Sequence, residues 1–381
     1  MQYIERQIID RIKAWLYKNK VIIIYGARQV GKSTVLKMLK QDCPELVILS
    51  AENSNIKDIL SSMNIERIKF LFKSSKLVAI DEAQKIENIG SILKFIHDSN
   101  EIETQIIATG SSSFELANKV SEPLTGRNVK FILYPLSINE LIKEESEVWV
   151  VNNLNDIIVY GQYPEIITSD IWQKTVLLEN LNIDYLFQDI LKMDNLLNSQ
   201  TISKLLKALA YQIGSQISYH EIGQILGLAS QTVQKYLDLL EKNFVIFSLP
   251  SYSGNLRNEI KKSRKYYFVD TGLRNAVIND FSPFGERKDK GGLWENFCIA
   301  ERMKYHQMQN QKATMYFWRT YDQAEIDLVE NINGKLSIFE FKSGIKRMKP
   351  FPESFKKAYP VNHEITISPS NFFNLLNDFQ N

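Results

Sequence analysis

The chain has 381 residues, which is too many for one ordinary hydrophobic core and predicts two or three domains. Hydrophobic residues make up 44% of it and charged residues 24%, as is typical of soluble globular proteins. The formal net charge is only +2, which excludes a polycation, so any surface that binds nucleic acid has to be local.

Cysteines and apolar runs indicate the compartment. Cys43 and Cys298 lie far apart and lack the spacing of a zinc site, so no disulfide framework is expected and a reducing cytoplasm fits. The longest apolar runs have the length of a strand, well short of the roughly 20 residues of a membrane span. The N-terminus has no signal-peptide core. We therefore expect a cytoplasmic protein with no membrane partner.

The first motif, "VIIIYGARQVGKSTVLKMLK", has a strand-like run, a loop with glycines and a helical pattern. Gly26, Gly31, Lys32 and Ser33 fit G-x-x-x-x-G-K-[ST], in which bare backbone N–H groups approach phosphates. We expect Lys32 to reach the β- and γ-phosphates of ATP and Ser33 to hold Mg²⁺. A chance glycine-rich turn is disfavoured by the flanking strand and helix. The predicted nucleotide-binding residues are Gly26, Ala27, Arg28, Gln29, Val30, Gly31, Lys32, Ser33 and Thr34.

A second apolar run, "KLVAIDEAQ", ends in two adjacent carboxylates, Asp81 and Glu82. A phosphate–metal site needs one acid near Mg²⁺ and another that orients or deprotonates the attacking water. Asp81 suits the first role, through a water or through Ser33, and Glu82 suits the second. Alone, such a pair is more often a solvated turn, but its position after the glycine-rich motif favours catalysis.

A third run, "TQIIATGSSS", ends in hydroxyl groups. We predict that Ser111, with Thr109 beside it, is a sensor for the γ-phosphate; the alternative is a strand end capped by serines. Arg127 follows a glycine turn before another strand. It can neutralise charge in the transition state of its own subunit or of a neighbour in a homo-oligomer, or it can be a surface arginine.

Together these runs predict a doubly wound α/β layer, a P-loop NTPase sheet of parallel strands with the site at its carboxyl edge. The predicted strands are residues 21–25, 46–50, 77–81, 105–109 and 129–134.

From about residue 150 the spacing becomes helical. A short helix from Glu221 to Leu226, a Gly-Leu-Ala turn, a second helix capped by Ser230 and a strand from Phe244 predict a winged helix-turn-helix. The second helix is expected to bury Val233, Tyr236, Leu237 and Leu240.

This region is also the candidate reader of nucleic acid, with DNA favoured over RNA. The exposed residues of the second helix are predicted to be Gln231, Thr232, Gln234 and Lys235. The segment "NLRNEIKKSRKYY" is the predicted wing, and its positive charge suits a phosphate backbone. Its basic residues are Arg257, Lys261, Lys262, Arg264 and Lys265. Winged helices also serve as protein-interaction or structural modules, and a charge run is usually a solvated face.

The last third, "YFWRTYDQAEIDLVENINGKLSIFEFKSG", predicts a hairpin-rich sheet with a turn at Asn333 and Gly334. Asp327 and Glu340, with Glu295 from a preceding helix, are the predicted ligands of a second Mg²⁺ or Mn²⁺. Lys342 would stabilise an attacking water or developing charge. An E-x-K pair on a strand is more often a solvated face, and whether such a site cleaves nucleic acid is left open.

In this order, "YGARQVGKST", "AIDEAQKI", "ATGSSSFEL", "LTGRNVKFILYPLSINEL", "KYYFVDTGLRNAV", "GLWENF", "YFWRT", "EIDLV" and "FEFKSG" resemble prokaryotic AAA-type ATPases fused to a C-terminal domain of unknown function. The resemblance covers nearly the whole chain. It implies an ATP-binding domain, a winged helix and a restriction-endonuclease-like PD-(D/E)XK core. Its functional positions correspond to Lys32, Ser33, Asp81, Glu82, Glu295, Asp327, Glu340 and Lys342. Gln162 and Ala27 depart from the pattern, where glycine and proline are usual, but neither is a catalytic group.

The expected domains are an ATPase at 1–145, a helical connector at 146–200, a winged helix at 201–280 and a nuclease-like α/β domain at 281–381. The expected function is an ATPase whose nucleotide state controls a C-terminal half that binds nucleic acid, with metal-dependent cleavage left open. The alternative is a nucleotide-dependent switch or scaffold that binds a protein partner through an inactive nuclease-like fold.

Overall fold

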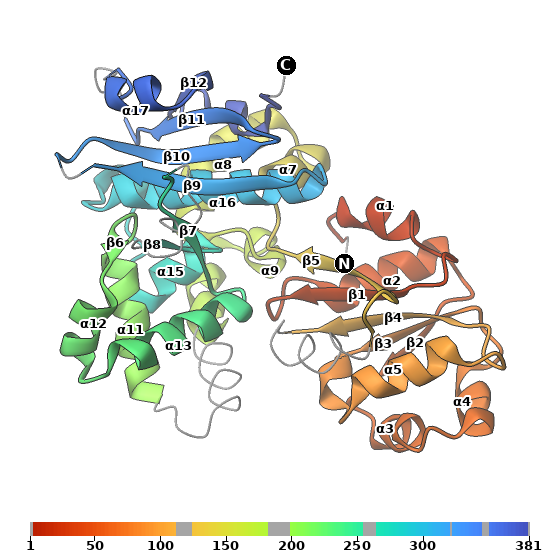
Figure 1. Ribbon diagram of the computed structural model, residues 1–381. Coiled ribbons are helices and arrows are strands. Elements are labelled where there is room, and N and C mark those ends of the chain that lie inside the picture. Colours follow the sequence, from red (N-terminus) through yellow and green to blue (C-terminus); the bar gives the residue numbers. More distant parts are fainter. Residues whose placement is uncertain are drawn as a thin grey trace. The chain divides into compact units, whose positions relative to one another are not determined.

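The computed structural model describes residues 3–111, 124–181, 199–253, 264–320, 322–344 and 350–379 (Figure 1). The chain forms two compact units. The first comprises Met1–Leu136 with Lys242–Phe244, and the second comprises Ser137–Glu241 with Val245–Asn381. The finer domain boundaries at residues 145, 200 and 280 stay predictions.

The first unit contains a five-stranded sheet in which every neighbouring pair of strands is parallel. Its order is β2-β3-β4-β1-β5. The strands are β1 (Val21–Gly26), β2 (Val47–Ser50), β3 (Leu77–Asp81), β4 (Gln105–Gly110) and β5 (Asn128–Leu133). The sequence therefore located all five strands to within one or two residues. Each is a short, strongly apolar run, the pattern of a parallel strand buried on both faces.

Helices cover both faces of this sheet. They are α1 (Ile8–Lys13), α2 (Lys32–Asp42), α3 (Ser54–Ser61), α4 (Ile65–Phe72) and α5 (Ile89–Asp98), with the 3₁₀ turn η1 (Ala83–Lys85). The crossover from β1 to β2 moves toward the β2 edge of the sheet. The crossovers from β2 to β3 and from β3 to β4 move back in the opposite direction. Because crossovers are right-handed, α2 and α5 lie on opposite faces, as Figure 1 shows.

The second unit begins with helices and ends with two small sheets. Its helices are α7 (Ile138–Glu144), α8 (Glu147–Tyr160), α9 (Pro164–Ile167), α11 (Ser199–Tyr211), α12 (Tyr219–Leu226), α13 (Ser230–Lys242), α15 (Thr271–Ile278), α16 (Lys290–Met308) and α17 (Glu353–Ala358), with 3₁₀ turns η2 (Phe284–Glu286) and η3 (Phe372–Leu376). A three-stranded antiparallel sheet has the order β6-β8-β7. Its strands are β6 (Gln216–Ile217), β7 (Ile246–Pro250) and β8 (Arg264–Phe268).

The helix–turn–helix of this unit has the predicted form. Gly227 ends α12 in the left-handed region at φ 69°, which a glycine adopts without strain. Residues Val233, Tyr236, Leu237 and Leu240 are buried on α13, as predicted. The backbone carbonyl of Ala229 accepts from the N–H of Val233, so Ala229, and not Ser230, holds the N-cap position.

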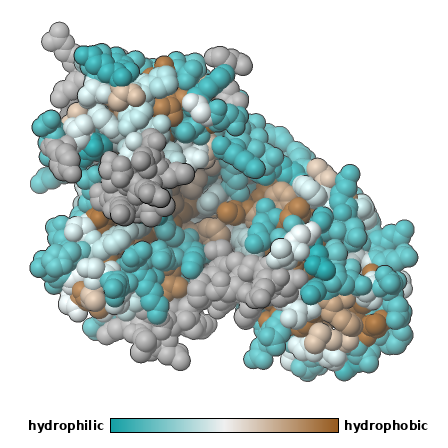
Figure 2. Space-filling view, viewed as in Figure 1, coloured by the Kyte–Doolittle hydropathy of each residue, from teal (hydrophilic) through white to brown (hydrophobic). Residues whose placement is uncertain are grey.

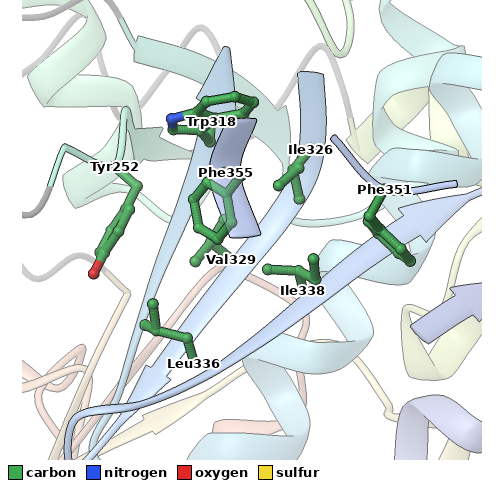
Figure 3. Packing of buried hydrophobic residues seen from close by; sticks show 8 residues of the cluster. All are labelled: Tyr252, Trp318, Ile326, Val329, Leu336, Ile338, Phe351 and Phe355. Atoms are coloured by element: carbon green, nitrogen blue, oxygen red, sulfur yellow. The ribbon is translucent and has the colours of Figure 1, made fainter. Parts of the chain in front are cut away.

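A mixed four-stranded sheet of order β12-β11-β10-β9 completes the unit. Its strands are β9 (Ala313–Arg319), β10 (Glu325–Ile332), β11 (Lys335–Phe341) and β12 (Val361–Ile367). Strands β9, β10 and β11 are antiparallel, and β12 is parallel to β11. The β10–β11 turn has Asn333 and Gly334 at φ 54° and 86°, which confirms the predicted hairpin. Figure 3 shows the core on one face, where Phe355 of α17 packs over Ile326, Val329 and Ile338.

A buried ion pair connects α16 to β10. The guanidinium of Arg302 donates to both oxygens of Glu330, at 2.7 Å each, and Nε2 of His306 lies 3.0 Å from Glu330. Burial alone would raise the pKa of Glu330, but Arg302 and His306 outweigh it and hold that pKa at about 2. Such a carboxylate stabilises the fold above its ordinary pKa of 4.5, and the stabilisation is lost as pH falls toward about 2.

We expect Glu330→Gln to lower the free energy of unfolding by about 3–5 kcal/mol near pH 7, because it leaves the buried Arg302 without its counter-charge. Thermal unfolding of the variant should also change less than that of the wild type between pH 5 and pH 3. The control is Glu353→Gln, at an exposed ion pair with Lys356, which should unfold like the wild type. Equal melting temperatures for Glu330→Gln and the wild type would contradict the stabilising role.

Within the described residues, no helix is both long enough and apolar enough to cross a membrane. Figure 2 shows hydrophobic side chains interspersed among hydrophilic ones on the face in view.

Candidate functional site

The loop between β1 and α2 approaches its neighbours closely. An added Cβ at Gly26 would lie 2.3 Å from the backbone carbonyl oxygen of Leu133, so glycine is required there by the proximity of β5. Gly31 lies in the left-handed region at φ 97° and precedes the first residue of α2. The loop therefore presents backbone at the positive N-terminal end of an eleven-residue helix, which is where an anion binds.

Lys32 is the first residue of α2, and only 5% of it is exposed. Its ammonium group donates to the carbonyl oxygens of Gly26, at 2.9 Å, and of Ala27, at 2.7 Å. The positive charge is therefore held beneath the loop, beside the backbone amides that the sequence predicts for phosphate binding.

Ser33 and Asp81 meet, as the sequence predicted. The Ser33 hydroxyl donates to Oδ2 of Asp81 at 2.6 Å, and Thr109 donates to Oδ1 at 2.5 Å. Strand β4, which ends in Thr109 and Gly110, lies between β1 and β3, so three strands bring these side chains to one edge. A hydroxyl and a carboxylate oxygen are the protein ligands that a phosphate-bound Mg²⁺ prefers, so these residues fit that ion.

Glu82 is held in a defined position next to Asp81. It lies in the left-handed region at φ 56°, and its backbone N–H donates to the Thr109 hydroxyl at 3.1 Å. The side-chain amide of Gln84 donates both to Oε2 of Glu82, at 2.7 Å, and to the hydroxyl of Ser111, at 2.9 Å. The predicted water-orienting acid and the predicted sensor are thus joined through one buried amide.

The structure does not bring Arg127 to this edge. Its carbonyl accepts from the N–H of Val21, the first residue of β1, whereas the phosphate-binding loop follows the last residue, Gly26. Six residues of strand put about 17 Å between these ends. A hydrogen bond from Arg127, and a second from His97, lower the pKa of Asp98 to about 2. Of the roles that the sequence leaves open for Arg127, the structure therefore does not support one at the site of its own subunit, and a role at a neighbour's site stays a prediction.

Two residues of the site were missed from the sequence. Gln84 lies in "DEAQK" and was not distinguished from its polar neighbours. Arg6 belongs to no motif in the sequence, yet it is 3% exposed, and it donates to the carbonyl of Val30 in the loop and to that of Tyr134, at 2.7 Å each. Arg6 therefore fixes the phosphate-binding loop to the segment after β5, and no local sequence signal predicts a contact 128 residues away.

In the second unit, the predicted acids Glu295, Asp327 and Glu340 lie in one neighbourhood, with Lys342 paired to Glu340. Asp327 accepts the backbone N–H of Phe341 at 2.8 Å. Burial first, and then the charges of Glu295 and Glu340, raise the pKa of Asp327 well above its usual value. Burial acts to lower the pKa of Lys342, but Glu340 outweighs it and raises that pKa.

These acids do not have the arrangement of a metal site. Among the described residues, no group of three or more His, Cys, Asp or Glu side chains is positioned to hold a metal ion. Glu295 instead accepts hydrogen bonds from Lys265 at 3.1 Å and from the hydroxyl of Tyr267 at 2.6 Å. The residues present therefore do not fit the second Mg²⁺ or Mn²⁺, and we derive no step through one.

The predicted wing needs a correction. Its residues 254–263, which include Arg257, Lys261 and Lys262, lie outside the described residues. Lys265 is 1% exposed on β8, and it faces acids instead of solvent, so it is not part of a surface that binds phosphate. The α13 residues Gln231, Gln234 and Lys235 are exposed, as predicted, and Thr232 is half-buried.

Comparison with known families divides the chain into three segments. Residues 18–142 match an AAA domain, residues 151–283 a domain of unknown function (DUF8612), and residues 290–378 a second domain of unknown function (DUF4143). The N-terminal segment is thus a P-loop AAA ATPase domain, for which ATP and Mg²⁺ binding is implied. The resemblance read from the motifs is confirmed to that extent.

Two relatives that match most of this chain are described as uncharacterized proteins. A protein of Mycobacterium tuberculosis is 25% identical over 340 residues, which are 88% of this chain and 73% of the relative. A protein of Methanocaldococcus jannaschii is 26% identical over 341 residues, 83% of this chain and 74% of its own. Among solved structures, a Walker-type ATPase of Pyrococcus abyssi is 15% identical and has a TM-score of 0.49, over 72% of this chain and 96% of that one.

Proposed function

We propose that the chain hydrolyses Mg-ATP and that its nucleotide state controls a C-terminal half that binds nucleic acid. The observation that carries the ATPase proposal is the 2.6 Å hydrogen bond from Ser33 to Asp81 at the loop that covers the buried Lys32. Lys32 and Ser33 are the first two residues of α2, and the Ser33 hydroxyl meets the Asp81 carboxylate there. Bound Mg²⁺ would neutralise charge on the β- and γ-phosphates.

Residues of the chain bind the triphosphate, orient the attacking water and position the catalytic acid. The amides of the loop and Lys32 bind and orient the triphosphate. Glu82 orients or deprotonates the attacking water. Gln84 positions the Glu82 carboxylate, and because it also donates to Ser111, a change at either residue is transmitted to the other.

The order of elements supports a winged helix in the second unit. A helix, a short strand, two further helices and two strands run from α11 to β8, and β8 lies in the middle of the three-stranded sheet. The exposed polar face of α13 supplies amides and Lys235, which suit base edges and phosphates. DNA is the proposed partner because a helix of this kind enters the DNA major groove, whereas the major groove of RNA is too narrow to read.

The order α16, three antiparallel strands, α17 and a parallel fourth strand supports a restriction-endonuclease-like core. We do not propose that it cleaves, because its acids are engaged by protein donors. This observation favours the second candidate for the C-terminal half, a nucleotide-dependent switch that binds a protein through an inactive nuclease-like fold.

Binding of a mixed-sequence DNA duplex, followed by fluorescence anisotropy at rising KCl, tests the nucleic-acid proposal. We expect the logarithm of affinity to fall linearly with the logarithm of salt concentration, at about −0.9 per phosphate contacted. Lys235→Glu should weaken binding about tenfold, since it replaces a phosphate-pairing charge with a repelling one.

Lys312→Glu, the same charge change at an exposed residue before β9, is the matched control and should bind like the wild type. The measurement is repeated with ADP and with a slowly hydrolysed ATP analogue, which should give different affinities. A response that is flat with salt would reject phosphate contacts and favour the protein-binding switch.

A further inference from the structure

The acid cluster of the second unit contains a lysine that is not part of the predicted E-x-K pair. Lys265 comes from β8, in the three-stranded sheet, and its ammonium lies 3.1 Å from Oε1 of Glu295 and 2.6 Å from Oε1 of Glu325. These two acids belong to α16 and β10. One side chain therefore joins three elements of the second unit.

The surroundings of Lys265 stabilise a buried positive charge. The side chain is 1% exposed, and its ammonium lies 5.5 Å from the ring centroid of Phe317 on β9, within the range of a cation–π contact. Tyr267, also on β8, donates its hydroxyl to the same Glu295 oxygen at 2.6 Å. A buried ammonium is stable only with counter-charges and hydrogen-bond acceptors, and Glu295 and Glu325 supply both.

A divalent ion would compete with this arrangement. It would need Glu295, whose Oε1 already accepts from Lys265 and Tyr267, and it would lie close to a fixed ammonium. Like charges a few ångströms apart in a buried setting repel strongly. Moving Lys265 away would leave Glu325 without its closest partner.

We propose that Lys265 is the resident cation of this cluster, so that the nuclease-like centre is a lysine-filled lock between the two sheets of the second unit and not a divalent-metal site. The lock holds β8, the strand that follows the wing segment, against α16 and β10. This proposal does not depend on ATP hydrolysis, so it can fail or stand without the ATPase.

Manganese alone is the probe of the first experiment. Nucleotide-free wild type and Asp327→Asn are titrated with Mn²⁺, and the free ion is followed by electron paramagnetic resonance. We expect the same amount of bound Mn²⁺ in both proteins. A bound ion that the wild type holds and that Asp327→Asn and Glu340→Gln both lose would overturn the proposal.

The second experiment measures thermal unfolding of Lys265→Met, which we expect to melt about 10 °C below the wild type because it leaves buried acids uncompensated. Lys265→Arg keeps the charge and should recover part of that loss. Lys342→Met removes the other lysine, which is 29% exposed, and should lower the melting temperature less.

A double-mutant cycle between Lys265→Met and Glu295→Gln completes the test, and the two substitutions should be non-additive. If Lys265→Met does not fold, the melting temperature of Lys265→Arg and the manganese titration of the wild type still test whether Lys265 is the cation of the cluster. A Lys265→Met variant that melts with the wild type, or additive effects in the cycle, would show that Lys265 does not hold the cluster.

Discussion

Replacing Lys32 with alanine is expected to lower the rate of ATP hydrolysis by about 10³-fold, the scale of losing one preorganised donor to transition-state charge. The affinity for Mg-ATP should fall roughly tenfold to a hundredfold, since hydrogen bonds from a charged donor are among the stronger ones. The measurements are phosphate release and calorimetric titration. Lys32 is suited to this role because it is buried at the start of α2, beneath the loop.

Lys37→Ala is the matched control. Lys37 lies on the same helix, is exposed and follows the loop by more than one helical turn. Its replacement should therefore leave the rate of ATP hydrolysis and the affinity for Mg-ATP unchanged. Melting temperatures of the variants identify any loss caused by unfolding, because Lys32 also donates to the carbonyls of Gly26 and Ala27. A folded Lys32→Ala protein that hydrolyses ATP at the wild-type rate would remove the loop from the mechanism.

The nucleotide site could be predicted from the sequence because its determinants are local. Each strand is an apolar run of four to six residues. Asp81 and Thr109 lie at the carboxyl ends of β3 and β4, and Ser33 lies at the start of α2, the helix that follows β1. In a parallel sheet all these positions lie at one edge, so spacing alone brings Ser33, Asp81 and Thr109 together. The same reasoning separates Arg127 from the site, because it precedes β5 and so lies at the other edge of the sheet.

Contacts between distant segments could not be predicted. Arg6 reaches Tyr134 across 128 residues, and Lys265 reaches Glu295 across 30, and neither pair has a periodicity or a motif. For Lys265 the composition of its segment was misleading, because a run of basic residues usually forms a solvated face. Lys265 is instead buried, and its burial depends on how β8 pairs with β7 and β6, which the sequence of the segment does not reveal.

The contacts of Gln162 with distant segments could not be predicted from the sequence either. From the sequence it was a departure from the family pattern without consequence for catalysis. In the structure its backbone N–H donates to Asp270 at 2.7 Å, and its side-chain oxygen accepts from the buried Lys304 at 2.9 Å. A polar residue at this position thus links α15 and α16 to the segment after α8, which a sequence pattern alone does not reveal.

The second large effect is expected for Glu82→Gln, which should reduce hydrolysis by about 10²–10⁴-fold while ATP affinity stays within a few-fold of the wild type. Glutamine has the shape of glutamate and can still accept a hydrogen bond from Gln84, so the positions of Gln84 and Ser111 should persist. Only the capacity to deprotonate or strongly orient water is lost. Single-turnover hydrolysis and equilibrium binding separate these two quantities.

Glu87→Gln is the control, since Glu87 is an exposed acid five residues further along and should behave like the wild type. Two outcomes would count against the assigned role. Hydrolysis at the wild-type rate would mean that another group orients the water. Parallel loss of binding and turnover would mean that the carboxylate supports the site through Gln84 and Ser111 instead of acting on water. A kcat that falls alone is the result that the geometry around Glu82 predicts, because its backbone is fixed by Thr109 and its side chain by one amide.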